Sequence, residues 1–307
     1  MNYAIIDIGS NTIKMTVFSE KLLPVYKSSR AARLLSYVKN GVLSKDGEGV
    51  LLTTLSDFKK EALSLGPTKL YAFATASFRA ISSPLPTIER VRESLGIKVD
   101  LLSGDEEAKI SFDGVVGALG ENGSGLLFDM GGGSTEIIAY EDREIKSSVS
   151  MPFGALSLYR DFVSDTYPSV KEIDAITEYV KKIGKPEIEG ALRHSHSCSV
   201  TVIGGSFRAL AVVISELFGS SFSPDSPYIM RAHELDLLIK RFSPVSSSDA
   251  SIIEALIPDR KTNLVPALIS LYVFALLTGA NEITLSPYGA REGYLLKIKD
   301  EKKGDHS

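Results

Sequence analysis

The feature that most constrains the fold of this chain is a short motif that occurs twice. Near the N-terminus, an apolar strand-like run ends in Asp7, and a turn of small and polar residues leads to a second β-prone run at 13–18. The same order returns at 125–140, where the apolar run ends in Asp129. A gapless alignment of the two acids also pairs Gly9 with Gly131 and Thr12 with Ser134. A duplicated domain that begins with strand, tight turn and strand is the simplest interpretation.

The length of 307 residues also favours two domains, because a single hydrophobic core rarely grows that large. Strand and helix patterns alternate between and after the two hairpins, which predicts α/β layers. We expect an N-terminal domain over residues 1–120 and a C-terminal domain over 121–289. A helix at about 290–303 could pack back on the first domain.

Hydrophobic periodicity and turn residues predict the other elements. The expected strands are 69–75, 97–102 and 200–203, and the expected helices are 85–95, 105–119, 169–183 and 231–242. The charged segment 297–307 is expected to fray. The apolar stretch 264–280 contains Pro266 and is slightly short for a membrane span, so a buried core helix is the better interpretation.

Composition excludes several classes of function. The net charge of -4 provides no overall basic field for nucleic acid, so any phosphate-rich partner must be bound locally. Cys198 is the single cysteine and cannot form an intramolecular disulfide, and the N-terminus does not resemble a signal peptide. We therefore expect a cytoplasmic protein with no membrane or nucleic-acid partner.

An acid at the end of a buried strand, followed by a turn rich in glycine and hydroxyl groups, suits phosphate binding. Backbone N–H groups and a hydroxyl can surround phosphate oxygens while the carboxylate holds a hydrated cation. Either turn alone could be an ordinary hairpin turn, but their repetition with matching acids favours function. The expected phosphate-binding residues are Gly9, Ser10, Asn11 and Thr12 in the first turn and Gly131, Gly132, Gly133, Ser134 and Thr135 in the second. The expected metal-binding acids are Asp7, Asp129 and Glu136, and for Glu136 an exposed acid on the strand is the alternative.

Three further features are ambiguous from local sequence. The segment Gly204-Gly205-Ser206 precedes a helix and could cradle a phosphate or a ribose, or Ser206 could simply cap the helix. Arg79 could neutralise phosphate charge or be a solvated surface arginine. Glu107, beside Glu106, could orient water or be an ordinary acid in the first turn of a helix.

Seven segments taken in chain order resemble the exopolyphosphatase and guanosine pentaphosphate phosphatase family. They are Asp7 to Thr12, Ala74 to Arg79, Gly104 to Ala108, Asp129 to Glu136, Ile203 to Ser206, Pro258 to Arg260 and Gly289 to Gly293. The resemblance implies an actin-like ATPase fold of two ribonuclease H-like domains with the active site in the cleft between them. It also implies release of the terminal phosphate from polyphosphate, or of the 5′ phosphate from guanosine pentaphosphate.

The resemblance assigns roles residue by residue. Glu107 is similar to the water-activating glutamate of the family and Arg79 to its phosphate-binding arginine. Asp129 and Glu136 resemble the acids linked to Mg²⁺, for which Mn²⁺ could substitute. The segment 204–206 is a variant of the third glycine segment of the family. The chain resembles the short two-domain members, which lack additional C-terminal helical domains.

Two other functions remain open at this level. An actin-like kinase would transfer phosphate to a small acceptor, and a non-catalytic sensor would bind the same ligands and signal by domain closure. The basic residues Lys14, Arg30, Arg33 and Lys39 could extend a path for a polyanion or be scattered surface charge. A homodimer is also left open.

Overall fold

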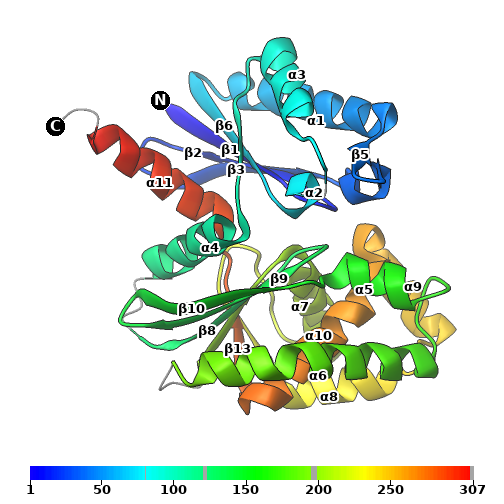
Figure 1. The fold of residues 1–307 in the computed structure, drawn as a ribbon. Coiled ribbons are helices and arrows are strands. Elements are labelled where there is room, and N and C mark those ends of the chain that lie inside the picture. Colours follow the sequence, from blue (N-terminus) through cyan, green and yellow to red (C-terminus); the bar gives the residue numbers. More distant parts are fainter. Residues whose placement is uncertain (80, 120–122, 195–198, 305–307) are drawn as a thin grey trace. The chain divides into compact units, whose positions relative to one another are not determined.

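The computed structural model describes residues 1–79, 81–119, 123–194 and 199–304 (Figure 1). The chain forms two compact units, one of Met1–Gly114 with Ala290–Ser307 and one of Val115–Gly289. The expected boundary at residue 120 and the cysteine Cys198 lie outside the described residues.

The first unit is built on a five-stranded sheet in the order β3-β2-β1-β6-β7. Its strands are β1 Asn2–Ile8, β2 Ile13–Phe18, β3 Pro24–Arg30, β6 Thr68–Ala74 and β7 Val99–Leu101. The first three form an antiparallel meander, and β6 and β7 continue the sheet in parallel with β1. The other elements are η1 Leu34–Tyr37, the hairpin β4 Val38–Lys39 and β5 Val42–Leu43, α1 Lys45–Ser64, α2 Ala76–Arg79, α3 Leu85–Leu95, α4 Gly104–Leu119 and α11 Ala290–Gly304.

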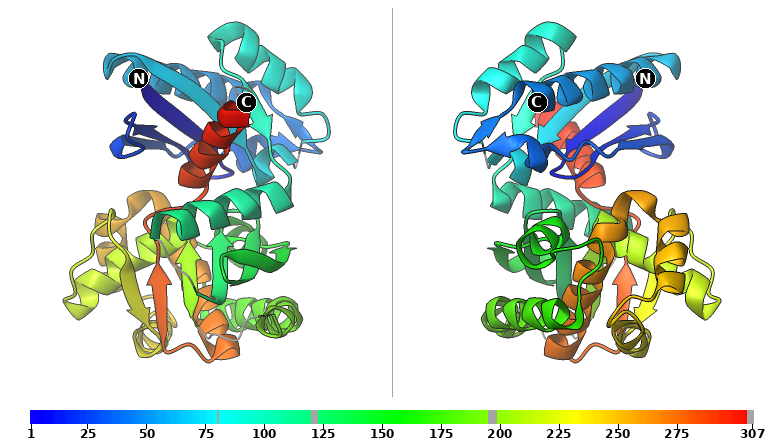
Figure 2. Two further views of the ribbon diagram at one scale, coloured as in Figure 1. Left: turned by 90° about the vertical axis from the view of Figure 1, so that its left-hand side faces the viewer. Right: turned by 90° about the vertical axis from the view of Figure 1, so that its right-hand side faces the viewer.

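The central strand β1 is apolar on both faces because helices cover both faces of this sheet. Its residues Ala4, Ile6 and Ile8 pack in one core with side chains of α1, which lies beside α3 (Figures 1 and 2). Ile5 points to the other face and packs in a separate core with Leu295 of α11 and Ile110 of α4. The C-terminal helix therefore completes the first unit.

The second unit is built on a six-stranded sheet in the order β10-β9-β8-β11-β13-β12. Its strands are β8 Gly125–Met130, β9 Thr135–Glu141, β10 Glu144–Met151, β11 Val200–Ile203, β12 Tyr228–Arg231 and β13 Glu282–Leu285. In sheet order, the five strands from β10 to β13 repeat the pattern of the other sheet, an antiparallel meander followed by parallel strands. The edge strand β12 is an addition and is antiparallel to β13. The helices are α5 Ala155–Phe162, α6 Val170–Leu192, α7 Gly205–Phe218, α8 Ala232–Arg241, α9 Ser247–Leu256, η2 Pro258–Arg260 and α10 Lys261–Thr278.

The apolar stretch near residue 270 is a core helix, as expected. Within the described residues, Pro258–Thr278 is the one segment long and apolar enough to cross a membrane, and 72% of its most apolar window is buried. The ring of Phe274 stacks on Phe128 of β8 with ring centroids 4.5 Å apart. Helix α10 packs against α6 on one side of the sheet (Figure 2).

The predicted fold class is confirmed, because both units repeat one α/β topology of the ribonuclease H-like type that the actin-like fold duplicates. Several bounds differ. The strand expected at 97–102 is shorter, and α6 continues to Leu192 even though it contains Pro186. Fraying from Lys297 onward is wrong for the described part, since α11 is helical to Gly304 and is held by the buried Leu295 and Ile298.

Candidate functional site

In the first unit, three candidate segments follow parallel strands that end at the same edge of the sheet. Ile8 of β1 is paired with Ala74 of β6, and Ala74 is paired with Leu101 of β7. The first glycine turn follows β1, α2 with Arg79 follows β6, and α4 with Glu107 follows β7. The carboxyl edge of such a sheet is where open α/β proteins bind ligands.

Arg79 and Glu107 form an ion pair at this edge. The Arg79 Nη1 donates to Glu107 Oε2 at 2.6 Å and to the carbonyl oxygen of Leu102 at 3.1 Å. The two side chains are 27% and 15% exposed, so the pair is largely shielded and still reachable. The structure therefore brings together the two residues that local sequence left ambiguous.

The neighbouring acid Glu106 has a different task. Ser103 and Glu106 form a capping box at the start of α4, in which Glu106 Oε2 accepts from the Ser103 backbone N–H at 2.8 Å. The Ser103 Oγ accepts from the Glu106 N–H at 3.1 Å. The backbone hydrogen bond from Ser103 lowers the pKa of the Glu106 carboxyl. Glu106 fixes the helix start, and Glu107 is the acid directed at Arg79.

The first glycine turn is held by its carbonyl groups. The Ser10 carbonyl accepts from the Leu35 N–H at 3.2 Å, and the Asn11 carbonyl accepts from the Arg33 N–H at 2.8 Å. In a trans peptide the C=O and N–H point in opposite directions, so the N–H groups of Asn11 and Thr12 point away from the segment 33–35. This orientation is the one an anion-binding turn requires.

Close packing within the turn requires glycine at position 9. A Cβ on Gly9 would lie 2.9 Å from the carbonyl oxygen of Thr12 and 3.8 Å from Asp7 Oδ1. The Asn11 Nδ2 lies 3.5 Å from Thr12 Oγ1. The turn therefore places Asp7 Oδ1 near Gly9 and the Asn11 amide beside the Thr12 hydroxyl.

The second glycine turn is held in the same way. The Gly131 carbonyl accepts from the Ala155 N–H at 3.2 Å, and the Gly132 carbonyl accepts from the Leu156 and Ser157 N–H groups at 3.0 and 2.9 Å. The N–H groups of Gly132 and Gly133 consequently point away from α5. A Cβ on Gly154 would lie 2.6 Å from the Gly131 carbonyl oxygen, so the start of α5 packs directly on the turn.

The bonds that hold the two turns also match along the chain. The bond from Ser157 to Gly132 falls at the same offset in sequence as the bond from Leu35 to Ser10. The structural repeat therefore extends beyond the hairpins, to the segment that follows the third strand of each unit.

The two acids of the second hairpin face each other. Asp129 is paired with Glu136 across β8 and β9, and Asp7 is paired with Lys14 across β1 and β2 at the matching position of the repeat. Glu136 is 2% exposed, and its Oε1 accepts from Ser150 Oγ at 2.9 Å.

Ser134 and Thr135 follow the glycines of the second turn. The Thr135 Oγ1 donates to the Phe153 carbonyl at 2.8 Å, so this hydroxyl bonds to the segment that follows β10.

The pair Asp129 and Glu136 fits a magnesium ion. Mg²⁺ binds through oxygen ligands and commonly takes one or two carboxylates, with water and substrate phosphates completing its shell. Among the described residues, no group of three His, Cys, Asp or Glu side chains could hold a metal ion. Asp7, the third acid expected to bind metal, is paired with Lys14 across β1 and β2.

The third glycine segment lies beside the second turn, since Ile203 of β11 is paired with Asp129 of β8. Gly204 is the N-cap residue of α7 and has φ 128, and a Cβ there would lie 2.4 Å from the Met130 carbonyl oxygen. Ser206 is buried inside the first helical turn, so the alternative that Ser206 caps the helix is wrong.

Arg260 is a candidate that sequence reasoning did not assign. A Cβ on Gly205 would lie 2.5 Å from an Nη atom of Arg260, so the glycine allows the guanidinium to approach the start of α7. Burial lowers the pKa of Arg260, and the nearby Arg208 acts in the same direction. The segment Pro258 to Arg260 is one of the seven that resemble the family. That resemblance is the sequence signal that could have identified Arg260 as a candidate.

Comparisons with known proteins show which proteins this chain is similar to. Exopolyphosphatase 1 of Mycobacterium tuberculosis is 26% identical over 98% of this chain and 89% of its own length. A guanosine-5'-triphosphate,3'-diphosphate pyrophosphatase of Photobacterium profundum is 27% identical over 61% of this chain and 38% of its own length. The crystal structure of an exopolyphosphatase from Cytophaga hutchinsonii has a TM-score of 0.87 at 21% identity, covers 98% of both chains, and supports the fold.

A sequence model of the Ppx/GppA phosphatase family matches residues 15–302, which is nearly the whole chain. The prediction of a phosphate-releasing hydrolase is confirmed at the level of the family. This chain belongs to the Ppx/GppA phosphatase family.

Proposed function

We propose that the chain releases the terminal phosphate of inorganic polyphosphate, or the 5′ phosphate of guanosine pentaphosphate, by in-line attack of water. The observation that carries the proposal is the ion pair between Arg79 and Glu107 at the edge where the first glycine turn ends. The ion pair would place a proton acceptor, Glu107, beside a phosphate-binding cation, Arg79. The names of the relatives indicate the two substrate classes.

In the proposed reaction, water attacks the terminal phosphorus and the bond from that phosphorus to the bridging oxygen breaks. Glu107 accepts a proton from the attacking water, and the remaining phosphate chain leaves with the bridging oxygen. Arg79 has five N–H donors and bonds Glu107 through Nη1, so its other donors can bind the transferred phosphate. The guanidinium would then hold base and phosphate next to each other.

The glycine turns would bind the phosphate oxygens. The donors would be the N–H groups of Asn11 and Thr12 in the first turn and those of Gly132 and Gly133 in the second. Arg260 would add positive charge near the start of α7. Asp129 and Glu136 would hold Mg²⁺, or Mn²⁺ in its place, and the ion when bound neutralises charge on the phosphate oxygens.

The direct test is phosphate release from long polyphosphate, guanosine pentaphosphate and ATP, each with Mg²⁺ and with chelator. We expect chelator-sensitive release from at least one of the first two. Glu107→Gln should lower kcat by about 100-fold or more, because positioned bases contribute about 10²–10⁴-fold. Binding without release would indicate a sensor, and release that requires an acceptor would indicate a kinase.

Glu106→Gln is the matched control. It removes the adjacent carboxylate of the same helix turn, so it should weaken the capping box and leave kcat close to wild type. A folded Glu107→Gln variant with wild-type kcat would contradict the assignment of the base.

A further inference from the structure

The segment that holds the first glycine turn contains an arginine in an uncommon backbone conformation. Arg33 has φ 49 and ψ 41, in the left-handed region that residues other than glycine rarely adopt. Its neighbours Ala32 and Leu34 are buried, and its N–H donates to the Asn11 carbonyl. Strained conformations of this kind persist where the surroundings impose them and are concentrated at functional sites.

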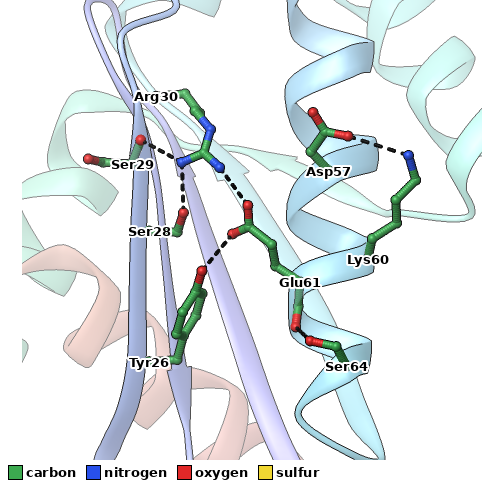
Figure 3. Close-up of polar contacts among 8 residues, drawn as sticks. All are labelled: Tyr26, Ser28, Ser29, Arg30, Asp57, Lys60, Glu61 and Ser64. Carbon is green, nitrogen blue, oxygen red and sulfur yellow. Dashed lines mark hydrogen bonds and ion pairs between the residues drawn. The ribbon is translucent and has the colours of Figure 1, made fainter.

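The side chain of Arg33 is exposed and makes no hydrogen bond or ion pair within the part of the chain that the structure describes. Arg30, at the end of β3, differs (Figure 3). Its guanidinium donates to Ser28 Oγ at 2.9 Å, the Ser29 carbonyl at 3.0 Å and Glu61 Oε1 at 2.5 Å. Arg30 therefore fastens the sheet to α1, whereas the charge of Arg33 is directed to solvent.

The bond that holds the first glycine turn at this position comes from the backbone of Arg33, whose N–H donates to the Asn11 carbonyl at 2.8 Å. The guanidinium takes no part in that bond. Within the part of the chain that the structure describes, the fold therefore does not use the charge of Arg33.

We propose that Arg33 binds a phosphate group of the substrate chain held at the first glycine turn. This inference rests on the proposed function and extends it to a substrate-binding residue. Arg33 neutralises a phosphate away from the reacting one, so it acts on substrate affinity, and the chemical step depends on Glu107 and Arg79. The ligand class is a linear phosphate chain or the polyphosphate part of a nucleotide.

Arg33→Gly is the test substitution, because glycine removes the charge and also fits the left-handed backbone. Arg143→Gly is a matched control. Arg143 is likewise exposed with φ 64, and it lies in the turn between β9 and β10, at the opposite end of β9 from the second glycine turn. We expect Arg33→Gly to raise KM about tenfold with kcat nearly unchanged, the size expected for one charge-assisted hydrogen bond. Its Tm should equal or exceed that of wild type.

Equilibrium binding of tripolyphosphate, measured by calorimetry, separates this inference from the proposed function. If wild type releases no phosphate, the proposed function fails, and the inference on Arg33 is decided by binding alone. Weaker binding by Arg33→Gly than by Arg143→Gly, with partial recovery in Arg33→Lys, supports it. Equal affinity in the two glycine variants, or no binding by wild type, overturns it.

Discussion

Helices α4 and α11 of the first unit touch at Gly293, and this contact leads to a sharp prediction. A Cβ on Gly293 would lie 1.7 Å from the carbonyl oxygen of Ile110, 2.7 Å from its carbonyl carbon and 2.9 Å from the Gly114 nitrogen. All three are backbone atoms, so no side chain can rotate away. Gly293→Ala must therefore move one helix relative to the other.

The cost can be estimated from the contact. Overpacking costs about 1–3 kcal/mol, and the upper end applies here because backbone atoms are struck. Alanine returns about 1 kcal/mol through its better helix propensity. We expect a net loss of about 2 kcal/mol in the free energy of unfolding, with a fall in Tm of roughly 4–8 °C. Glu107 lies one turn before Ile110 in α4, so kcat should also fall.

Urea denaturation of Gly293→Ala beside Gly49→Ala checks the reasoning. Gly49 is exposed inside α1, and a Cβ there would have no atom within 4 Å, so alanine should stabilise by up to about 1 kcal/mol. The two substitutions are chemically identical, and the predicted changes have opposite signs. If Gly293→Ala proves as stable as wild type, the close helix contact does not exist as described.

Two further predictions concern acids of the second unit. Asp129→Asn should raise the Mg²⁺ concentration for half-maximal phosphate release by about tenfold or more. The control Asp142→Asn, in the turn between β9 and β10, should leave this concentration unchanged. If Asp129→Asn also leaves it unchanged, Asp129 does not bind the metal. Hydrogen bonds from Ser169 and Ser164 lower the pKa of Glu172 from 4.5 to about 2, so Glu172 stabilises the fold above pH 4.5 and this contribution is lost as pH falls toward 2. Glu172→Gln should therefore cost about 1 kcal/mol in urea unfolding at neutral pH and much less at about pH 3, and equal losses at both would contradict the linkage.

Local signals in the sequence were sufficient for many element bounds. Helix α3 ends where predicted because Gly96 adopts the left-handed conformation that terminates a helix. Strands β2 and β11 also have the predicted bounds. Helix α1 was not predicted, and its first turns contain Gly47 and Gly49, which weaken the helical pattern. Tertiary packing of Leu51, Leu55 and Phe58 against the sheet stabilises it.

The candidate site was predicted unevenly. The repeated turns are visible in sequence because the acid, the glycines and the flanking strands are adjacent in the chain. Arg79 and Glu107 are 28 residues apart, and only the parallel pairing of β6 with β7 brings their segments to one edge. Their catalytic roles, and those of the acids expected to bind metal, stay predictions.

The sequence by itself determined the duplicated hairpins, because turn geometry, glycine and strand periodicity act over a few neighbouring residues. It also predicts that the two turns bind phosphate. Only the tertiary structure decided that Glu107 meets Arg79. It alone placed Arg260 on Gly205 and showed that Arg30 is engaged while Arg33 faces solvent. These choices depend on strand register and on contacts between distant segments, which local sequence does not specify.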